Sequence, residues 1–197
     1  MSVSECFRMP RPVRITGRSS SITNAFVNGI IPCHEPTEAE ISEALGVLGL
    51  SADALKCIYC GDAATEWDHL RPIVRKQRPT GYISEIANLV PACGKCNQSK
   101  SGADWRTWIS GKAPRSPATR GVSDISQRIA RLEAYEKWRE PTIFDFESVV
   151  GQELWSMHWK NWEQLMDLMK ECEQVALRIR EAIESAAQQT HAARREA

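Results

Sequence analysis

The sequence lacks an apolar run long enough to span a bilayer, and its first residues hold no uninterrupted apolar segment like that of a signal peptide. From these absences we expect a cytoplasmic protein without a membrane partner. No Walker loop is present, which argues against a nucleotide-driven translocase. Net charge is also missing, because 25 lysines and arginines balance 25 aspartates and glutamates, so the chain as a whole does not indicate a polyanionic partner.

The zero net charge hides a strong polarity along the chain. The net charge is +3 over residues 1–34, −7 over 35–70, +8 over 71–120 and −4 over the remainder. A basic block therefore follows directly on an acidic one. Because a local excess of cations is what a ligand with a phosphate backbone needs, the pattern favours a nucleic-acid contact in the basic block.

A disulfide framework is absent as well. Four of the seven cysteines form two Cys-x-x-Cys pairs: Cys57/Cys60 and Cys93/Cys96. Each pair places two thiolates on one tight turn, and two pairs complete a closed tetrahedral zinc site with no open position for catalysis. Such a pair can also be redox-active, but two pairs in this layout favour a structural zinc that staples a small unit. The remaining three are scattered, and we interpret them as ordinary thiols: Cys6, Cys33 and Cys172.

The 32 residues between the two pairs exceed the spacing of a simple zinc ribbon, so they need structure of their own. TEWDHL is a short strand candidate, NLVPAC is a second, and CGKCNQSKSGADWRTWI starts a helix whose apolar residues fall on one side. The first strand carries Asp68 and His69, the second begins at Asn88, and Asn97 directly follows the last cysteine.

This order of strand, loop, strand and helix resembles the HNH nuclease family. The resemblance is carried by D-H, N-L and C-x2-C-N-x2-K in register with a second C-x2-C, and it covers residues 57–108. It implies the ββα-metal fold, in which many members also bind a structural zinc through four cysteines. We therefore expect an α+β protein: a zinc-stapled ββα-metal core with an N-terminal arm and helix and a long C-terminal helical extension. The third motif position is asparagine here, a common variant of the histidine in the family's name.

Hydrolysis of a phosphodiester needs an activated water, charge relief for the transition state and help for the leaving 3′ oxygen. His69 is the candidate general base, since histidine titrates near neutral pH. Asp68 and Asn97 offer hard oxygen ligands for Mg²⁺ or Mn²⁺. The resemblance assigns the same roles, and it gives Asn88 the middle position, which supports the loop and helps to hold His69. Neighbours on a strand point to opposite faces, so Asp68 and His69 can meet at one cation only at a strand end, which Pro72 provides.

Several cations are candidate DNA contacts. One lies a helical turn beyond Asn97, three lie in the loop between the strands, and two belong to a basic N-terminal arm: Lys100, Arg75, Lys76, Arg78, Arg14 and Arg18. The alternatives are a solvated face for the loop and a poorly ordered tail for the arm.

The chain divides by composition into four predicted parts. They are an N-terminal arm with an amphipathic helix, the nuclease core, a Pro/Gly/Ser linker and a C-terminal helical region: residues 1–52, 53–110, 111–122 and 123–197. Thr37 and Glu40 predict a capping box at the start of the first helix. A helix after the linker is expected to end at Pro141.

Apolar residues follow a heptad pattern over about residues 148–190, through Trp155, Trp162, Met169, Ile179 and Ile183. This seam predicts a helix-mediated homodimer. The alternative is that the seam packs on its own domain.

The sequence thus predicts a divalent-metal-dependent endonuclease, a hydrolase that cuts double-stranded DNA and leaves a 5′ phosphate and a 3′ hydroxyl as the family does. A chain of this size without a translocase motif resembles small bacterial HNH restriction endonucleases, which suggests a sequence-specific, type II-like enzyme. The alternatives are a phage or homing nickase, a less specific defence nuclease, and a zinc DNA-binding module without catalysis. The intact set of Asp68, His69 and Asn97 argues against the last.

Overall fold

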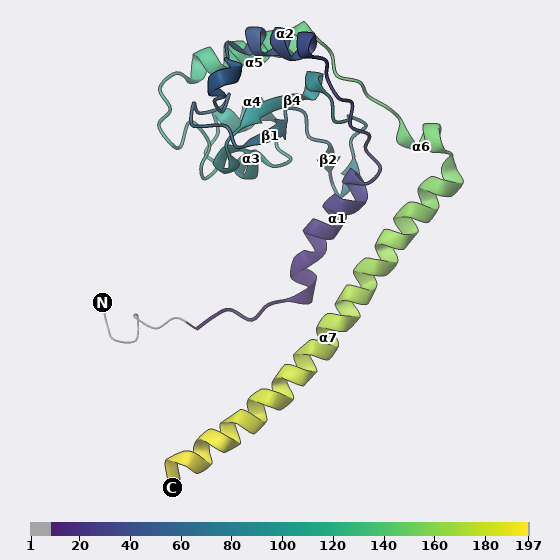
Figure 1. Ribbon diagram of the computed structural model, residues 1–197. Coiled ribbons are helices and arrows are strands. Elements are labelled where there is room, and N and C mark those ends of the chain that lie inside the picture. Colours follow the sequence, from purple (N-terminus) through teal and green to yellow (C-terminus); the bar gives the residue numbers. More distant parts are fainter. Residues whose placement is uncertain (1–8, 197) are drawn as a thin grey trace. The chain divides into compact units, whose positions relative to one another are not determined.

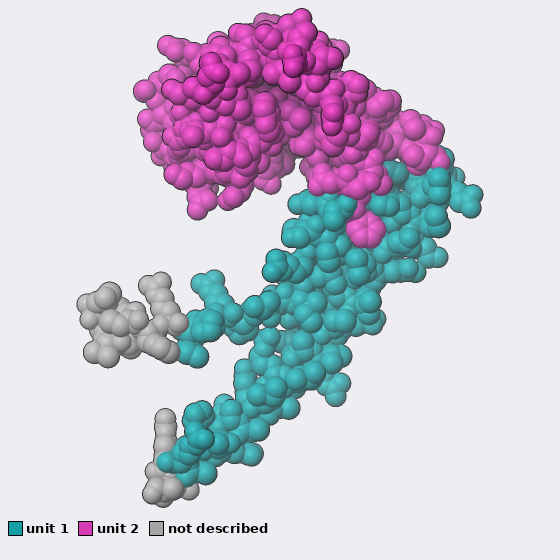
Figure 2. Space-filling view, viewed as in Figure 1, with its two compact units in different colours: residues 1–25, 151–197 teal, residues 26–150 magenta. Residues whose placement is uncertain are grey.

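The computed structural model describes residues 9–196 (Figure 1). In chain order the elements are η2 (Ile15–Arg18), α1 (Ser19–Asn28), α2 (Glu38–Leu48), η3 (Ala52–Ala54), β1 (Glu66–His69), β2 (Val74–Arg75), β3 (Arg78–Pro79), η4 (Ile86–Asn88), β4 (Leu89–Ala92), α3 (Gly94–Lys100), α4 (Trp105–Ile109), α5 (Ile125–Trp138), α6 (Phe146–Val150) and α7 (Gln152–Glu196). Of the helices described, none is both long enough and apolar enough to cross a membrane. Contacts divide the chain into two compact units, residues 26–150 and residues 1–25 with 151–197 (Figure 2).

The centre of the unit formed by residues 26–150 is a two-stranded antiparallel sheet. β1 pairs with β4, and His69 lies opposite Leu89 in the register. Both predicted strands are thereby confirmed. The connection between them contains a smaller hairpin, β2–β3, whose two-residue turn has positive φ at Lys76 and Gln77, as a type I′ turn requires.

The single helix predicted after the second cysteine pair is two helices. α3 ends at Lys100, because Ser101 adopts a φ of 47°, outside the helical region. α4 begins after Asp104, whose carboxylate accepts a hydrogen bond from the Thr107 backbone N–H at 3.0 Å. The apolar period continues across this break and conceals it in the sequence. The apolar side chains of α4 are buried as predicted: Trp105, Trp108 and Ile109.

Two longer helices, α2 and α5, pack beside each other in the same unit (Figure 1). α2 begins at the predicted capping box, in which Thr37 and Glu40 bond reciprocally, and it ends at Gly49 with a left-handed φ of 63°. The hydroxyl of Tyr135 on α5 donates to the Leu89 carbonyl at 2.9 Å. This bond ties α5 to the first residue of β4.

The segment predicted as a linker, residues 111–122, packs against the core. Ser116 is fully buried, and its hydroxyl donates to the Gly111 carbonyl at 2.7 Å. The contacts therefore place this segment and α5 in the same compact unit as the nuclease core. The predicted division separates them from the core, and that division stays a prediction.

In the other unit, α7 is a single helix of 45 residues, which confirms the long C-terminal helix. The N-terminal segment lies along one face of it. The Thr16 backbone N–H donates to the Glu173 carboxylate at 3.0 Å, and the Trp162 indole donates to the Thr23 hydroxyl at 3.1 Å. Trp162 and Met169 are buried, so this half of the predicted heptad seam is covered within the chain.

Candidate active site and zinc centre

The four predicted zinc ligands converge on one point. Their sulfur atoms lie within 4.8 Å of one another. Cys57 and Cys60 lie on the turn before β1, and Cys93 and Cys96 lie just after β4. Because β1 and β4 run antiparallel, the segment before one strand meets the segment after the other.

The electrostatics of this cluster favour a bound cation. The hydrogen bond with Cys60, followed by burial, raises the pKa of Cys57 to about 12. Hydrogen bonds with Cys57 and Cys60 and burial also raise the pKa of Cys96. Thiols this crowded cannot all ionise unless a positive ion compensates them. Zn²⁺ takes four thiolates in a closed tetrahedral site, so the donor set fits structural zinc.

Two arginines that the sequence analysis did not predict contact the cysteine centre. Arg120 donates to the Cys96 sulfur at 3.4 Å and to the Asp62 carboxylate at 2.7 Å. Arg128 donates to two carbonyls of the first cysteine turn. Gly61 gives it space, since a Cβ there would lie 2.7 Å from the Arg128 Nη2 atom. Such outer contacts orient metal ligands and tune their charge.

Asp68 and Lys100 form a buried ion pair between β1 and α3. The Lys100 ammonium lies 3.0 Å from Asp68 Oδ2 and donates to the His69 carbonyl at 2.8 Å. The Tyr59 hydroxyl also donates to Asp68 Oδ2, at 2.5 Å. Burial raises the pKa of Asp68, and the charge of Lys100 opposes that rise. The Lys100 side chain is 0% exposed, which contradicts the predicted phosphate contact.

His69 is the last residue of β1, so the strand end that Asp68 and His69 need in order to converge is present. The two side chains nevertheless have different partners, because neighbours on a strand alternate between faces. His69 Nε2 lies 2.8 Å from the Ser84 hydroxyl. Burial, and then the charge of Lys100, lower the pKa of His69 to about 4. The imidazole is therefore neutral at pH 7, as a general base must be.

The two motif asparagines have separate tasks. Asn88 is fully buried, and its amide bonds to both the N–H and the carbonyl of Arg71, at 2.8 and 3.0 Å. These bonds hold the backbone just beyond His69, and the supporting role of Asn88 in the site stays a prediction. Asn97 on α3 donates its Nδ2 to Glu66 Oε2 at 2.6 Å. The sequence analysis did not name Glu66 as a site residue. Its position two residues before Asp68 was the available signal, because residues two apart on a strand share one face.

The predicted DNA contacts other than the buried lysine fall into two groups. Arg75, Lys76 and Arg78 form the tip of the β2–β3 hairpin, where Arg75 and Lys76 are exposed. Arg14 and Arg18 are exposed beside η2, in the unit that contains α7. Their roles remain predictions.

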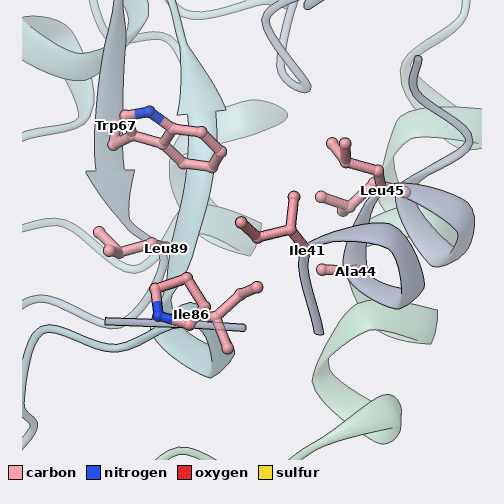
Figure 3. A pocket seen from close by; sticks show the side chains of 8 residues that line it. Ile41, Ala44, Leu45, Trp67, Ile86 and Leu89 are labelled. Carbon is pink, nitrogen blue, oxygen red and sulfur yellow. The ribbon is translucent and has the colours of Figure 1, made fainter. Parts of the chain in front are cut away.

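An apolar cavity of about 230 Å³ lies on the Trp67 face of the sheet (Figure 3). Trp67 and Leu89 form one wall, and Ile41, Ala44 and Leu45 of α2 form the opposite wall. The eight residues that line it are all apolar, so the cavity adds no catalytic group.

β1 and β4 form a two-stranded antiparallel sheet, and α3 follows it. The four-cysteine centre joins these elements, and a histidine lies at the end of β1. Together they define a ββα-metal unit. Residues 57–102 match the family model of the HNH endonuclease. No curated protein and no solved structure was found to match the chain. The matched stretch holds all four cysteines and the motif residues, so the predicted resemblance is confirmed. Residues 57–102 therefore form an HNH endonuclease domain, which implies a nuclease of the HNH family with DNA as its substrate.

Proposed function

We propose that this protein is an endonuclease that hydrolyses DNA phosphodiester bonds with the help of a divalent cation, and that His69 is its general base. The observation that carries the proposal is the position of His69, which is partly buried at the end of β1 within the stretch that matches the HNH family, with Nε2 2.8 Å from the Ser84 hydroxyl. In the tautomer whose Nε2–H donates to the Ser84 hydroxyl, Nδ1 has the free lone pair and accepts a proton from the attacking water. The resulting hydroxide attacks the phosphorus, and the bond to the 3′ oxygen breaks.

Asp68 and Asn97 are the proposed ligands of Mg²⁺ or Mn²⁺. Both offer hard oxygen atoms. Asp68 Oδ2 already accepts from Tyr59 and Lys100, so Oδ1, which accepts only from Lys100 at 3.2 Å, is the carboxylate oxygen with a lone pair left. When bound, the cation supplies positive charge to the phosphate and to the leaving oxygen. Asn88 supports the site by holding the backbone at Arg71.

We further propose a type II-like restriction endonuclease that acts on double-stranded DNA and leaves a 5′ phosphate and a 3′ hydroxyl. The exposed cations at the β2–β3 tip support a contact with the phosphate backbone. The alternatives are a nickase, a less specific defence nuclease and a zinc module without catalysis. Discrete fragments from long DNA support sequence specificity, whereas a smear or single-strand nicks alone favour the other nucleases.

Cleavage of both strands with one active site per chain requires two chains, and α7 supports a homodimer. Exposed apolar side chains recur on it at 11-residue intervals, as in Met157, Leu168 and Ile179, which are 53%, 54% and 56% exposed. Val175 and Ile183 continue the same stripe. An 11-residue repeat keeps a stripe on one side of a nearly straight helix, as in coiled coils of that period. The stripe shares Ile179 and Ile183 with the predicted heptad seam, but it departs from the first half of that seam, which the N-terminal segment covers.

Sedimentation of three proteins tests the dimer. Leu168→Asp combined with Ile179→Asp should convert a dimer into a monomer, because it places charges in the apolar contact. Gln174→Asp adds one negative charge, half of that in the double variant, at an exposed position away from the stripe and should remain dimeric. A monomeric wild type that still cuts both strands at once would reject the proposed dimer.

The catalytic proposal is tested with wild type, His69→Ala and His34→Ala on long unmethylated DNA with Mg²⁺, after zinc content is confirmed in each. His34 is an exposed histidine of the same unit and serves as the matched control. We expect cleavage by wild type and His34→Ala and none by His69→Ala. If all three bind DNA but none cuts, the zinc-module alternative takes precedence.

A further inference from the structure

Glu66 has no role in the mechanism described so far, although it faces α3 from the same strand as Asp68. The two carboxylates are two residues apart on β1 and project from one face of the sheet. On α3, Asn97 and Lys100 are three residues apart and share one side of the helix. Asn97 bonds to Glu66 while Lys100 pairs with Asp68, so two parallel contacts join the helix to the strand.

The contact with Glu66 determines which end of the Asn97 amide faces the strand. An ionised carboxylate only accepts hydrogen bonds, so the amide must present its NH₂ group to it, and Nδ2 lies 2.6 Å from Glu66 Oε2. Oδ1, the opposite end of the planar amide, is then turned away from Glu66. Without this partner the amide can rotate and present its nitrogen, which has no lone pair for a cation.

The local sequence leaves space for this arrangement. Gly94 begins α3, and a Cβ at this position would lie 2.8 Å from Glu66 Oε1, closer than side chains approach. Glu66 and Asn97 are both partly exposed, unlike the buried Asp68. Asn97 as a residue is therefore partly open to solvent, as a ligand of a hydrated cation must be.

We propose that Glu66 is a positioning residue of the nuclease site, which holds the Asn97 amide so that Oδ1 faces the catalytic cation. This inference rests on the proposed function, because it concerns the same cation site. Glu66 acts through Asn97 and touches no reacting atom. The role requires an acceptor oxygen at this distance, and it does not require a negative charge.

Mn²⁺ binding to the zinc-loaded protein, followed by electron paramagnetic resonance without DNA, tests the proposal. Glu66→Gln keeps an acceptor oxygen without the charge, Glu66→Asp keeps the charge on a side chain one methylene shorter, and Glu66→Ala removes both. We expect the glutamine variant to bind Mn²⁺ more weakly than wild type but more tightly than the alanine variant, because its amide oxygen can accept from Asn97 although its NH₂ group can also face Asn97. The aspartate and alanine variants should bind about 10–100-fold more weakly, the usual effect of losing a partner that orients a metal ligand.

Asn97→Ala should weaken Mn²⁺ binding at least as much as Glu66→Ala, because it removes the ligand itself, and the double variant should lose no more than Asn97→Ala, because Glu66 acts only through Asn97. Glu43→Ala, which alters an exposed carboxylate on α2, is the matched control and should bind like wild type. If the alanine variant loses zinc, the glutamine and aspartate variants decide the question.

Two results overturn the role of Glu66 while leaving the cation site intact. One is wild-type binding by Glu66→Ala, and the other is tight binding by Glu66→Asp together with weak binding by Glu66→Gln. A third result, equal binding by wild type and Asn97→Ala, removes the proposed cation site and the role of Glu66 with it.

Discussion

Replacement of Lys100 by methionine should destabilise the nuclease core. Methionine has a similar length, so the change removes the ammonium group and little volume. Asp68 would then lie buried with the Tyr59 hydroxyl as its remaining partner, and the His69 carbonyl would lose a donor. A buried charge without its counter-ion is the costly outcome.

The expected magnitude follows from the burial of both partners. The side chains of Lys100 and Asp68 are 0% and 5% exposed, so solvent screens their interaction little. Removing one partner of such a pair costs about 3–5 kcal/mol. For a unit of the size of residues 26–150 this corresponds to a fall in melting temperature of about 10–20 °C.

The same substitution should make stability depend on pH. Lys100 lowers the pKa of Asp68, so its loss lets that pKa rise further above the ordinary aspartate value. The folded variant then binds this proton more tightly than the unfolded chain. Its deficit relative to wild type should be largest near pH 7 and shrink as the pH falls toward the ordinary range of aspartate.

Thermal unfolding of wild type, Lys100→Met and Lys95→Met provides the assay, with zinc content measured in each. Lys95 is exposed on the same helix, and its variant should melt with wild type. A Lys100→Met protein that melts like wild type but binds DNA weakly would refute the argument and favour the phosphate contact predicted from the sequence.

Three further predictions concern the zinc centre and α2. Arg120→Ala should lower zinc affinity about 10–100-fold through loss of its bond to Cys96, as measured by chelator competition, while Lys112→Ala from the same segment should not. Removal of zinc should unfold the core, and addition of zinc should refold it, as followed by circular dichroism. A core that stays folded without metal would contradict the structural role of the zinc. The Thr37 backbone bond, and then Arg139, lower the pKa of Glu40 to about 2. Its contribution is therefore fully present above pH 4.5 and is lost as the pH falls from there toward 2. With zinc bound, wild type should exceed Glu40→Gln in urea stability by the same amount at pH 7 and at about pH 5.5, and a difference that shrinks between these values would contradict this.

Features that depend on short spacings could be predicted from the sequence. The two Cys-x-x-Cys pairs are recognisable because zinc geometry restricts how far apart two ligands on one turn can be. The capping box of α2 is equally local, since Thr37 and Glu40 are three residues apart. Both strands and the placement of Asp68 and His69 were predicted for the same reason.

The partners of the site residues could not be predicted in this way. Asn97 and Glu66 are 31 residues apart in the chain, and Lys100 and Asp68 are 32 apart. Helical spacing relates Lys100 to Asn97 on its own helix but does not show what the helix packs against. The sequence analysis therefore assigned Lys100 to solvent and phosphate, whereas the antiparallel sheet and α3 bury it against Asp68.

The sequence by itself determined the kinds of elements, the four cysteines that cluster and the strand-end position of the proposed general base, because these depend on residue types at short, regular distances. Only the tertiary structure decided which faces are covered. Along α7 the sequence shows apolar periodicity, but the N-terminal segment, bonded through Thr16 to Glu173 over 157 residues, determines which stripe remains exposed. Burial is a property of what packs against a surface, and a pattern within one helix does not contain that information.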